Sequence, residues 1–513
     1  MRLDRLFISN FKNLIDAEIN FDERSMTTVL IGRNATAKSN LLEALVSIFR
    51  HLDLKEDPPF RYRLSYLCRG RYIEIDADPQ KSKMVQIIVD GRPVSFSAFS
   101  EAPDRKYLPN NVFGYYSGTS RRLERYFDKH QERFYHQLLE GQKSPLRPLF
   151  FARMVHSQYV LLAFFSFEEA ESLQFLREYL GIVGFENATF VLKQPRWFQK
   201  KAKDDLFWGA RGVVRGFLDD LYSLETAAPI RKTERVALPW GRTKTEERLY
   251  LRIEDLNSLR KLASRYQNNV EFFKTLESTY ISDLIHELKI KVKKEGVEAS
   301  LEFAELSEGE QQLLTVLGLL RFTKEEESLF LLDEPDTHLN PAWKLEYTDL
   351  LQRVVGKNET SHVLVVTHDP LLIGGLKKEQ VQVFRLQGPE KRVVISPPEE
   401  DPIGIGVAGL LTSELFDLPT TLDLGTQKKL NRKKELAIKE RLTVGENQEL
   451  EKLDEELGKM GFLSVFRDPL YSQFIKAVGE YEQFQKPAFT PEERAEQVKL
   501  AKEIVARLMK GKG

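Results

Sequence analysis

Short apolar runs mark out strands near both ends of the chain. Residues 26–31 (MTTVLI) form a β-rich run that ends at a glycine, and residues 2–9 and 16–21 alternate or cluster apolar side chains as short strands do. Residues 328–332 (SLFLL) and 362–367 (HVLVVT) are continuous apolar runs, which is the pattern of parallel strands buried on both faces. The pattern predicts an α/β core assembled from two distant parts of the chain.

Helical periodicity accompanies these strands. After the glycine loop, Leu41, Leu42, Leu45 and Ile48 recur at helical spacing, which predicts a strand, a loop and a helix in succession. Residues 341–355 are also helical, begin with proline at a favoured first position, and lie between the two later strands. They predict a crossover unit between the two strands.

The middle of the chain has a different pattern. Residues 72–76, 84–89 and 112–116 are strand-like, and from about residue 120 to 290 the sequence becomes aromatic, basic and mainly helical. No heptad repeat persists there, so we expect a compact helical insertion and not a long coiled coil. A hairpin at 290–303 is expected to return the chain to the core.

Beyond about residue 400 the chain changes again. A connector rich in proline and glycine leads into charged helical segments at 427–458, and Thr490, Pro491 and Glu493 form a start signal for a last helix. We therefore predict an α/β core in two halves with two additions. The expected parts are residues 1–120 (first half), 121–289 (helical insertion), 290–400 (second half) and 401–513 (a helical region that docks a partner).

Composition narrows the class of protein. A chain of 513 residues with 42% hydrophobic and 30% charged residues is an ordinary globular protein of about two or three domains. Cys68 is the single cysteine, which excludes a disulfide framework or a cysteine zinc site and fits a reducing compartment. No apolar stretch approaches about 18 residues, so we expect a cytoplasmic protein without a membrane partner. With a net charge of -1, any nucleic-acid surface must be a local basic patch.

The loop GRNATAKS fits the phosphate-binding pattern GxxxxGK[ST] except at Ala37. In such loops backbone N–H groups wrap the phosphates, Lys38 reaches the terminal phosphates, and the Ser39 hydroxyl ligates Mg²⁺. The helix that begins there adds the positive end of its dipole. The residues expected to bind ATP are Gly32, Arg33, Asn34, Ala35, Thr36, Ala37, Lys38, Ser39 and Asn40.

Alanine at position 37 has a calculable cost. Glycine adopts left-handed backbone angles freely, whereas an L-residue loses roughly 1–2 kcal/mol there. If all of that fell on binding, affinity would drop by about tenfold, at about 1.4 kcal/mol per decade. Binding should therefore survive, but displaced phosphate contacts could cost about 100-fold in rate. The substitution favours a slow hydrolase or a nucleotide-gated switch.

Two further motifs contain groups that could act on a metal-bound phosphate. The strand SLFLL ends on adjacent carboxylates, of which Asp333 would hold Mg²⁺ and Glu334 would orient and deprotonate the attacking water. Upstream, LSEGEQQ places Ser307 and Gly309 at the start of a helix, which is a second anion-binding end.

The set GRNATAKS, LSEGEQQ, LLDEPDTHLNP and VVTHD, in that order, resembles the ATP-binding cassette head of the SMC, Rad50 and RecF group. The resemblance implies two ATP molecules sandwiched in a head-to-tail pair, in which Ser307, Gly309 and Glu310 act on the nucleotide of the other copy. It also implies that residues 336–340 link the two sites and that His368 senses the γ-phosphate. The loop after residues 112–116 (YYSGTSRR) is the best candidate for the glutamine-loop counterpart.

Within that group, VFGYYSGTS, LLTSELFDLP and FRDPLY resemble recurring segments of the ATPase subunit of Septu anti-phage systems, including retron-associated relatives. This resemblance implies an ATPase that assembles with itself and with a separate HNH nuclease. DNA, or a retron reverse transcriptase with its DNA, is a further implied partner. The chain shows no HNH-like cluster of its own, so DNA cleavage would occur in the partner.

Two other hypotheses remain open. A RecF-like DNA repair clamp would grip duplex DNA in its ATP-closed dimer, and the basic, aromatic segment KQPRWFQKKAK at 193–203 allows this. An inactive scaffold is the other hypothesis, although intact Lys38, Ser39, Asp333 and Glu334 argue against it.

Overall fold

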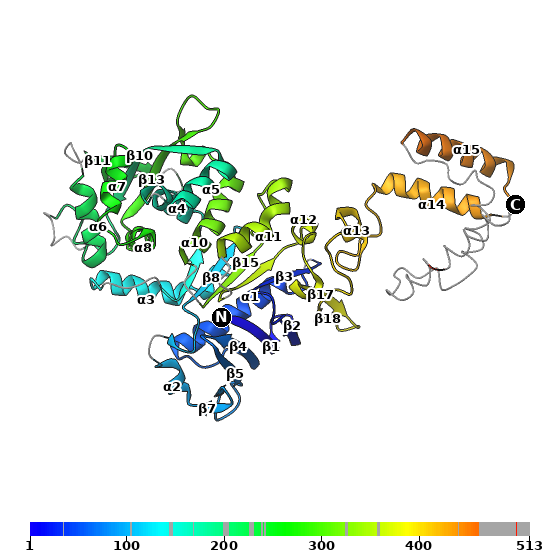
Figure 1. The fold of residues 1–513 in the computed structure, drawn as a ribbon, viewed down its shortest axis with the longest axis horizontal. Coiled ribbons are helices and arrows are strands. Elements are labelled where there is room, and N and C mark those ends of the chain that lie inside the picture. The colour runs from blue at the N-terminus through cyan, green and yellow to red at the C-terminus, as the bar shows by residue number, and fades with distance from the viewer. Residues whose placement is uncertain are drawn as a thin grey trace. The chain divides into compact units, whose positions relative to one another are not determined.

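The computed structural model describes most of residues 1–460, and residue 499. The gaps are residues 34, 103–104, 143–146, 168, 199–204, 225–229, 238–239, 241–242, 324–326, 356–359 and 440. The chain divides into two compact units, Met1–Val407 and Ala408–Gly513, which are described separately (Figure 1). The helix expected after Thr490 and the segment FRDPLY lie outside the described residues.

A seven-stranded sheet forms the centre of the first unit. Every neighbouring pair is parallel except the edge pair β17 and β18. The strand order is β18 (Arg392–Ser396), β17 (Val381–Gln387), β3 (Thr27–Gly32), β16 (His362–Val366), β15 (Ser328–Asp333), β8 (Asn111–Tyr116) and β9 (Leu149–Ala152).

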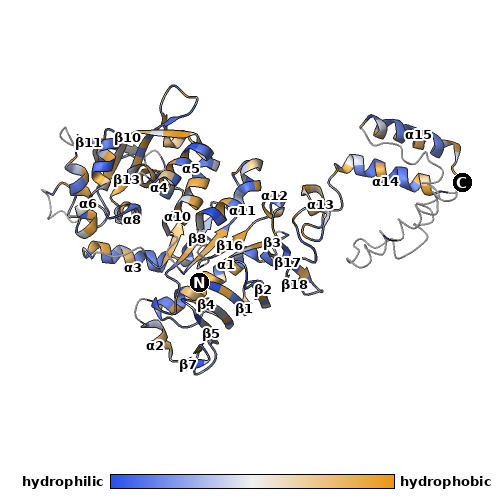
Figure 2. Cartoon of the chain, in the orientation of Figure 1, coloured by the Kyte–Doolittle hydropathy of each residue, from blue (hydrophilic) through white to orange (hydrophobic). Residues whose placement is uncertain are grey.

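The central strands are buried on both faces, as the continuous apolar runs predicted. Leu329 and Leu331 of β15 belong to the core beneath the sheet, whereas Phe330 stacks on Phe113 of β8 with ring centroids 5.0 Å apart. Figure 2 shows β16 and β8, the two neighbours of β15 in the sheet, as hydrophobic. The crossover helix α11 (Pro341–Val355) joins β15 to β16 with the predicted bounds.

Helix α1 (Lys38–Leu54) is buried between this sheet and a second, antiparallel sheet. One hydrophobic core joins Leu41, Leu45 and Ile48 of the helix to Leu3 and Leu331 of the two sheets. A helix that is apolar on most sides needs such a place between two layers. The second sheet has the order β2 (Leu14–Asn20), β1 (Arg2–Phe11), β4 (Tyr62–Cys68), β5 (Arg71–Ala77), β6 (Val85–Val89) and β7 (Arg92–Val94).

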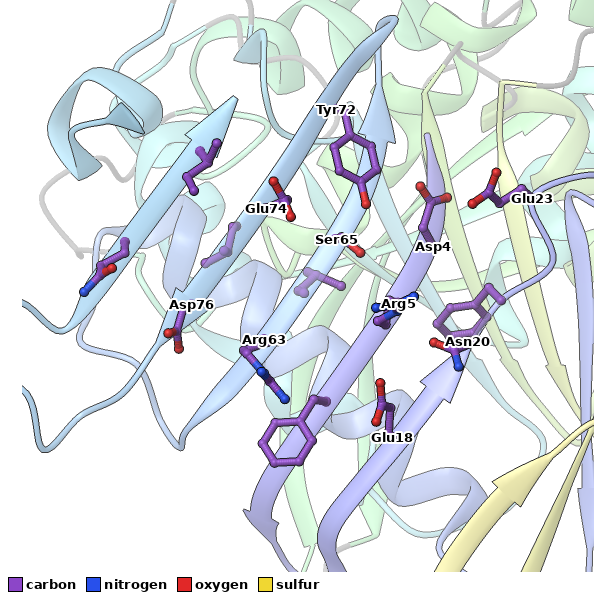
Figure 3. Close-up of a pocket in the computed structure, with 16 residues that line it drawn as sticks. Asp4, Arg5, Glu18, Asn20, Glu23, Arg63, Ser65, Tyr72, Glu74 and Asp76 are labelled. Atoms are coloured by element: carbon purple, nitrogen blue, oxygen red, sulfur yellow. The ribbon is translucent and has the colours of Figure 1, made fainter. Parts of the chain in front are cut away.

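The outer face of the antiparallel sheet is polar and hollowed. A cavity of about 510 Å³ lies on it, and Figure 3 shows Arg5 and Arg63 among the carboxylates of Glu18, Glu74 and Asp76. These positions alternate along their strands with core residues, as expected for an antiparallel sheet that is covered on one face only.

The insertion was predicted to be mainly helical, and this was only partly right. Its helices are α3 (Asp128–Leu139), α4 (Val155–Ser166), α5 (Ala170–Leu180), α6 (Gly212–Tyr222), α7 (Leu256–Ala263) and α8 (Asn269–Ile281). It also holds a five-stranded antiparallel sheet. The strand order is β11 (Ile230–Ala237), β12 (Thr243–Ile253), β10 (Ile182–Lys193), β13 (Ile285–Lys294) and β14 (Leu301–Glu302).

The missed sheet has a physical reason. In β13 the apolar residues Ile290 and Val292 are buried, while lysines alternate with them along the strand, so the segment reads as a charged surface. The predicted hairpin at 290–303 is present as the pair β13 and β14, with Lys291 opposite Glu302. It belongs to the insertion sheet and does not return the chain directly to the core.

The remaining helices complete both units. Helix α9 (Glu308–Leu313) continues through a π-helical turn, Leu314–Gly318, into α10 (Leu319–Thr323). Helix α13 (Val407–Thr412) begins at the unit boundary, and α14 (Leu424–Ile438) and α15 (Val444–Lys459) confirm the charged helices predicted at 427–458. Across the described residues, no helix has both the length and the apolarity to cross a bilayer.

A buried histidine ties three strands of the first unit together. His362 of β16 accepts the Leu3 N–H at Nδ1 (3.0 Å), and its Nε2 lies 3.0 Å from the Thr28 hydroxyl. Burial lowers the pKa of His362 to about 3, and burial likewise lowers the pKa of His51 in α1 to about 4. Both rings are therefore neutral in the folded protein at pH values where the unfolded chain, with a pKa of about 6.5, binds protons.

We predict that the free energy of unfolding is greatest above about pH 6.5 and falls as the pH drops towards 4. At pH 5 each of the two rings accounts for about 2 kcal/mol of this loss. Urea denaturation at pH 7.5 and pH 5 measures the difference. His362→Asn keeps a donor and an acceptor without a titrating ring and should reduce the loss by about 2 kcal/mol. An identical pH dependence in His362→Asn and the unmodified chain would refute the assignment.

Candidate nucleotide site

Four parallel strands end level with one another, and the predicted motifs follow their last residues. Asp333 at the end of β15 pairs with Val366 of β16 on one side and Tyr116 of β8 on the other, and Val366 pairs with Leu30 of β3. The carboxyl ends of β3, β16, β15 and β8 therefore meet at one edge of the sheet. Ligands bind at this edge in open α/β folds.

The phosphate loop begins where only glycine fits. Gly32 has a φ of 149°, and a Cβ atom there would lie 2.5 Å from the Phe384 carbonyl oxygen. Lys38 folds back into the loop, where its ammonium donates to the carbonyls of Gly32 (2.6 Å) and Arg33 (3.1 Å). Burial lowers the pKa of Lys38. The Thr36 hydroxyl closes the turn by donating to the Arg33 carbonyl at 2.7 Å.

Two alanines of the loop adopt left-handed backbone angles, Ala35 with φ 67° and Ala37 with φ 76°. Ala37 is the residue before α1, so the strain predicted for alanine at this position is present in the fold. Asn13 supports the loop from the β1–β2 turn, because its amide donates to the Ala35 carbonyl at 3.1 Å and also contacts Asn40. Asn34 lies outside the described residues.

The first carboxylate is joined to the phosphate loop. The Ser39 hydroxyl donates to Asp333 Oδ1 at 3.0 Å, and Arg122 donates to Asp333 Oδ2 at 3.1 Å. A hydroxyl and a carboxylate are the hard oxygen ligands that Mg²⁺ uses together with substrate phosphates. Within the described part of the chain no group of three or more His, Cys, Asp or Glu side chains could hold a metal by itself.

Asp333 is held in an environment that disfavours its charge. Burial raises its pKa to about 6, with a smaller contribution from Glu334, while Ser39, Arg122 and Lys38 act in the opposite direction. A buried carboxylate of this kind gains from a cation beside it. The residues present therefore fit a magnesium ion between Ser39 and Asp333.

The second carboxylate belongs to Glu334, whose backbone is strained but held by hydrogen bonds. Glu334 has a φ of 53°, its N–H donates to the Val366 carbonyl at 2.8 Å, and its own carbonyl accepts from the Thr337 hydroxyl at 2.9 Å. Its carboxylate lies 3.4 Å from Nδ1 of His368, and both side chains are partly exposed. The backbone is fixed while the carboxylate faces solvent, as a group that orients water requires.

The residues of LSEGEQQ form a separate group. Ser307 caps α9 and forms a capping box with Glu310, whose other carboxylate oxygen contacts Lys294. A Cβ atom at Gly309 would lie 2.5 Å from the His338 carbonyl oxygen, so this glycine lets α9 pack against residues 336–340. The side chains of Ser307 and Glu310 thus contact each other, and that of Glu310 also contacts Lys294. Glu310 is engaged within its own chain at both oxygens.

Sequence reasoning missed three residues at the site. Arg122 is in the loop YYSGTSRR, which was singled out by position only, and its contact with Asp333 was not foreseen. Gln312 donates to the Glu334 carbonyl at 3.4 Å and accepts the His338 N–H at 3.0 Å. Asn13 lies in the segment FISNFKNL. In the sequence, each of the three is a polar residue in or near a recognised segment. Such residues are too common for that position alone to indicate a contact at the site.

A phosphate loop after β3, a carboxylate pair after β15 and a histidine after β16 define a P-loop ATPase head of the ATP-binding cassette type, like those of SMC and Rad50 proteins. The chain belongs to the family described as "AAA domain, putative AbiEii toxin, Type IV TA system", whose model matches residues 91–374. A second model, described as "AAA ATPase domain", matches residues 1–95.

The chain also resembles the Septu protein PtuA of Bacillus mycoides (strain KBAB4). The two are 27% identical over 165 residues, which is 30% of this chain, and the match spans only 22% of the length of that protein.

Solved SMC heads are similar over 77% of this chain. The SMC head domain from Thermotoga maritima (99% covered) and the Smc head bound to the C-winged helix domain of ScpA (97% covered) are each 13% identical, with TM-scores of 0.33 and 0.34. The fold assignment rests on the strand order and motifs above.

We predict that Ala37→Gly tightens ATP binding by up to about tenfold and raises the hydrolysis rate, because glycine lets the loop adjust its left-handed turn around the phosphates without the roughly 1–2 kcal/mol that an L-residue costs there. Loss of one buried methyl costs about 0.8 kcal/mol, so the unfolding free energy should change little. Equilibrium titration with ATP and steady-state phosphate release measure the two effects. Ala35→Gly is the comparator for stability, because Ala35 has the same backbone strain but an exposed methyl. Weaker ATP binding in Ala37→Gly would contradict the prediction.

Proposed function

We propose that the chain is the nucleotide-gated ATPase subunit of an anti-phage defence complex and that it controls a separate HNH nuclease. The observation that carries the ATPase part is the meeting of Lys38, Ser39, Asp333 and Glu334 at one sheet edge. The defence part is supported by the similarity to PtuA and by the resemblance of VFGYYSGTS and LLTSELFDLP to segments of Septu ATPases.

The proposed hydrolysis uses the residues of this edge. Lys38 neutralises charge on the terminal phosphates, and Glu334 orients the attacking water and accepts its proton. His368, 3.4 Å from Glu334, positions that carboxylate and responds to the γ-phosphate. When bound by Ser39 and Asp333, Mg²⁺ supplies positive charge against the β- and γ-phosphates. The strained Ala37 makes the reaction slow, so the ATP-bound state lasts long enough to act as a signal.

We further propose that two copies pair head to tail, with higher assembly built from such pairs. Ser307 is exposed at the start of α9, where its helix N-terminus can approach the phosphates bound by the other copy. Gly309 keeps α9 close to residues 336–340, which would face the second copy. ATP then favours the paired state because only that state contacts it from both sides.

The nuclease partner is proposed to dock on the region after residue 400. Helices α14 and α15 are held together by the Arg432–Glu449 pair (2.9 Å), and apolar side chains such as Leu424 and Val444 are 74% and 78% exposed. A cytoplasmic location belongs to the same proposal. In retron-associated systems the reverse transcriptase and its DNA would be additional partners.

A DNA clamp of the RecF kind is the alternative function. The basic, aromatic segment that allowed it is partly engaged within the chain, because the Trp197 indole donates to the Ser282 carbonyl at 2.7 Å and Lys193 pairs with Asp283 at 2.5 Å. Residues 199–203 of that segment lie outside the described residues. Duplex DNA binding that weakens steeply with salt would favour the clamp. Co-purification with a small HNH protein would favour the defence complex.

We predict that Glu334→Gln retains ATP after desalting and accumulates as a dimer or larger assembly. Loss of the base slows hydrolysis by about 100-fold or more while the binding contacts remain. Chromatography of the retained nucleotide and light scattering of the protein measure both effects. Glu346→Gln, an exposed position on α11, is the control and should hydrolyse ATP at the unmodified rate. Rapid turnover of many ATP per second in the unmodified chain would contradict the slow switch.

We also predict that an HNH protein encoded beside this chain co-purifies with it and that its DNA cleavage depends on the nucleotide site. Lys38→Ala and Glu334→Gln should shift cleavage in opposite directions, because one disfavours and the other prolongs the ATP-bound state. Cleavage of a plasmid by the co-purified complex provides the readout. Equal cleavage by both variants would separate the nuclease from nucleotide control.

A further inference from the structure

Arg122 lies between two buried carboxylates at the nucleotide site. Its Nη2 donates to Asp333 Oδ2 at 3.1 Å, while its Nε, which makes no hydrogen bond, lies 3.6 Å from Glu43 Oε1. The side chains of Asp333 and Glu43 are each 1% exposed. The guanidinium also lies over the Tyr116 ring, 5.2 Å from its centroid, and a ring face attracts a cation at this distance. Arg122 is therefore bonded to one anion and stands beside a second.

Glu43, the second anion, belongs to the helix that begins at the phosphate loop. It follows Ser39 by four residues in α1, so the two side chains project from the same face of the helix. Its carboxylate also pairs with Lys12 and, at 3.8 Å, with Arg125. A buried carboxylate that attracts several cations is a suitable second partner for Arg122, because it can hold the guanidinium only one helical turn away from Ser39.

The contact between Arg122 and Asp333 conflicts with a magnesium ion at the same carboxylate. Asp333 Oδ1 accepts from the Ser39 hydroxyl and Oδ2 accepts from Arg122, so both oxygens are engaged within the chain. A metal ion held between Ser39 and Asp333 would share a single negative charge with the guanidinium, and two cations at such close range repel each other. Arg122 and Mg²⁺ are therefore competitors for Asp333.

We propose that Arg122 is a positioning residue that sets the affinity of the nucleotide site for Mg²⁺. It holds Asp333 while no metal is bound, and its guanidinium passes to Glu43 when Mg²⁺ binds with the nucleotide. Asp333 thereby stays paired in both states, and Mg·ATP binds only by displacing an internal cation. The inference deepens the proposed function: it rests on the nucleotide site of that proposal and does not depend on the nuclease partner.

The test measures the affinity of the full chain for the non-hydrolysable ATP analogue AMP-PNP by isothermal titration, once in excess EDTA and once in saturating Mg²⁺. The readout is the gain in affinity that Mg²⁺ confers, because any effect of Arg122 on the phosphates alone enters both measurements and cancels. Arg122→Gln keeps a hydrogen-bond donor for Asp333 but removes the charge, and it should increase this gain by about tenfold. Arg122→Lys keeps the charge and should leave the gain close to that of the unmodified chain.

Arg125→Gln is the matched control. Arg125 lies three residues further along the chain and pairs with Glu43, so loss of its charge should leave the gain from Mg²⁺ unchanged. An unchanged or smaller gain in Arg122→Gln would overturn the inference while the nucleotide site of the proposed function stands, and so would an equal increase in Arg125→Gln. Failure of the unmodified chain to bind AMP-PNP under either condition would overturn the proposed nucleotide site and the inference with it.

Discussion

The level ends of four parallel strands are the constraint on which the nucleotide site depends. Because Asp333 is in register with Val366 and Tyr116, the residues after β15, β16 and β8 reach the same edge as the phosphate loop after β3. The packing of α1 between two sheets fixes the loop from the other side, since the helix begins at Lys38 within one continuous core. His362 adds a cross-link from β16 to β1 and β3. Residues separated by some 300 positions are thereby held within hydrogen-bond distance, as Ser39 and Asp333 are.

Three residues at this edge have a strained backbone. Ala35, Ala37 and Glu334 all have positive φ angles, which are uncommon for residues other than glycine. The surrounding contacts determine these conformations, because the backbone of Glu334 is bonded at both its N–H and its carbonyl. Such positions cost of order 1–3 kcal/mol each and persist at functional sites where the rest of the structure compels them.

Much of the core could be predicted from the sequence because its signals are local. Apolar runs predicted β3, β15 and β16 to within one or two residues of their observed ends, and a proline marked the first residue of α11. The candidate site residues came from motifs next to these elements. The insertion sheet could not be predicted, because β10 and β13 pair across about 100 residues and the exposed face of β13 carries lysines that suit a helix surface equally well. Arg122 and Gln312 were missed for a related reason. Their roles come from tertiary contacts with Asp333, Glu334 and His338, and nothing in their own neighbourhood identifies them.

Gln312 has a particular consequence for a paired assembly. Its single amide group touches the carbonyl of Glu334 and the N–H of His338, and it lies on the same short helix as Ser307 and Gly309. If two copies pair as proposed, the start of α9 touches the nucleotide of one copy while Gln312 touches the water-orienting residue of the other. The two sites would then be joined by one turn and a half of helix, with no flexible linker between them. A displacement at one nucleotide would then also shift the residue that orients water at the other, so occupancy of the two sites would be coupled.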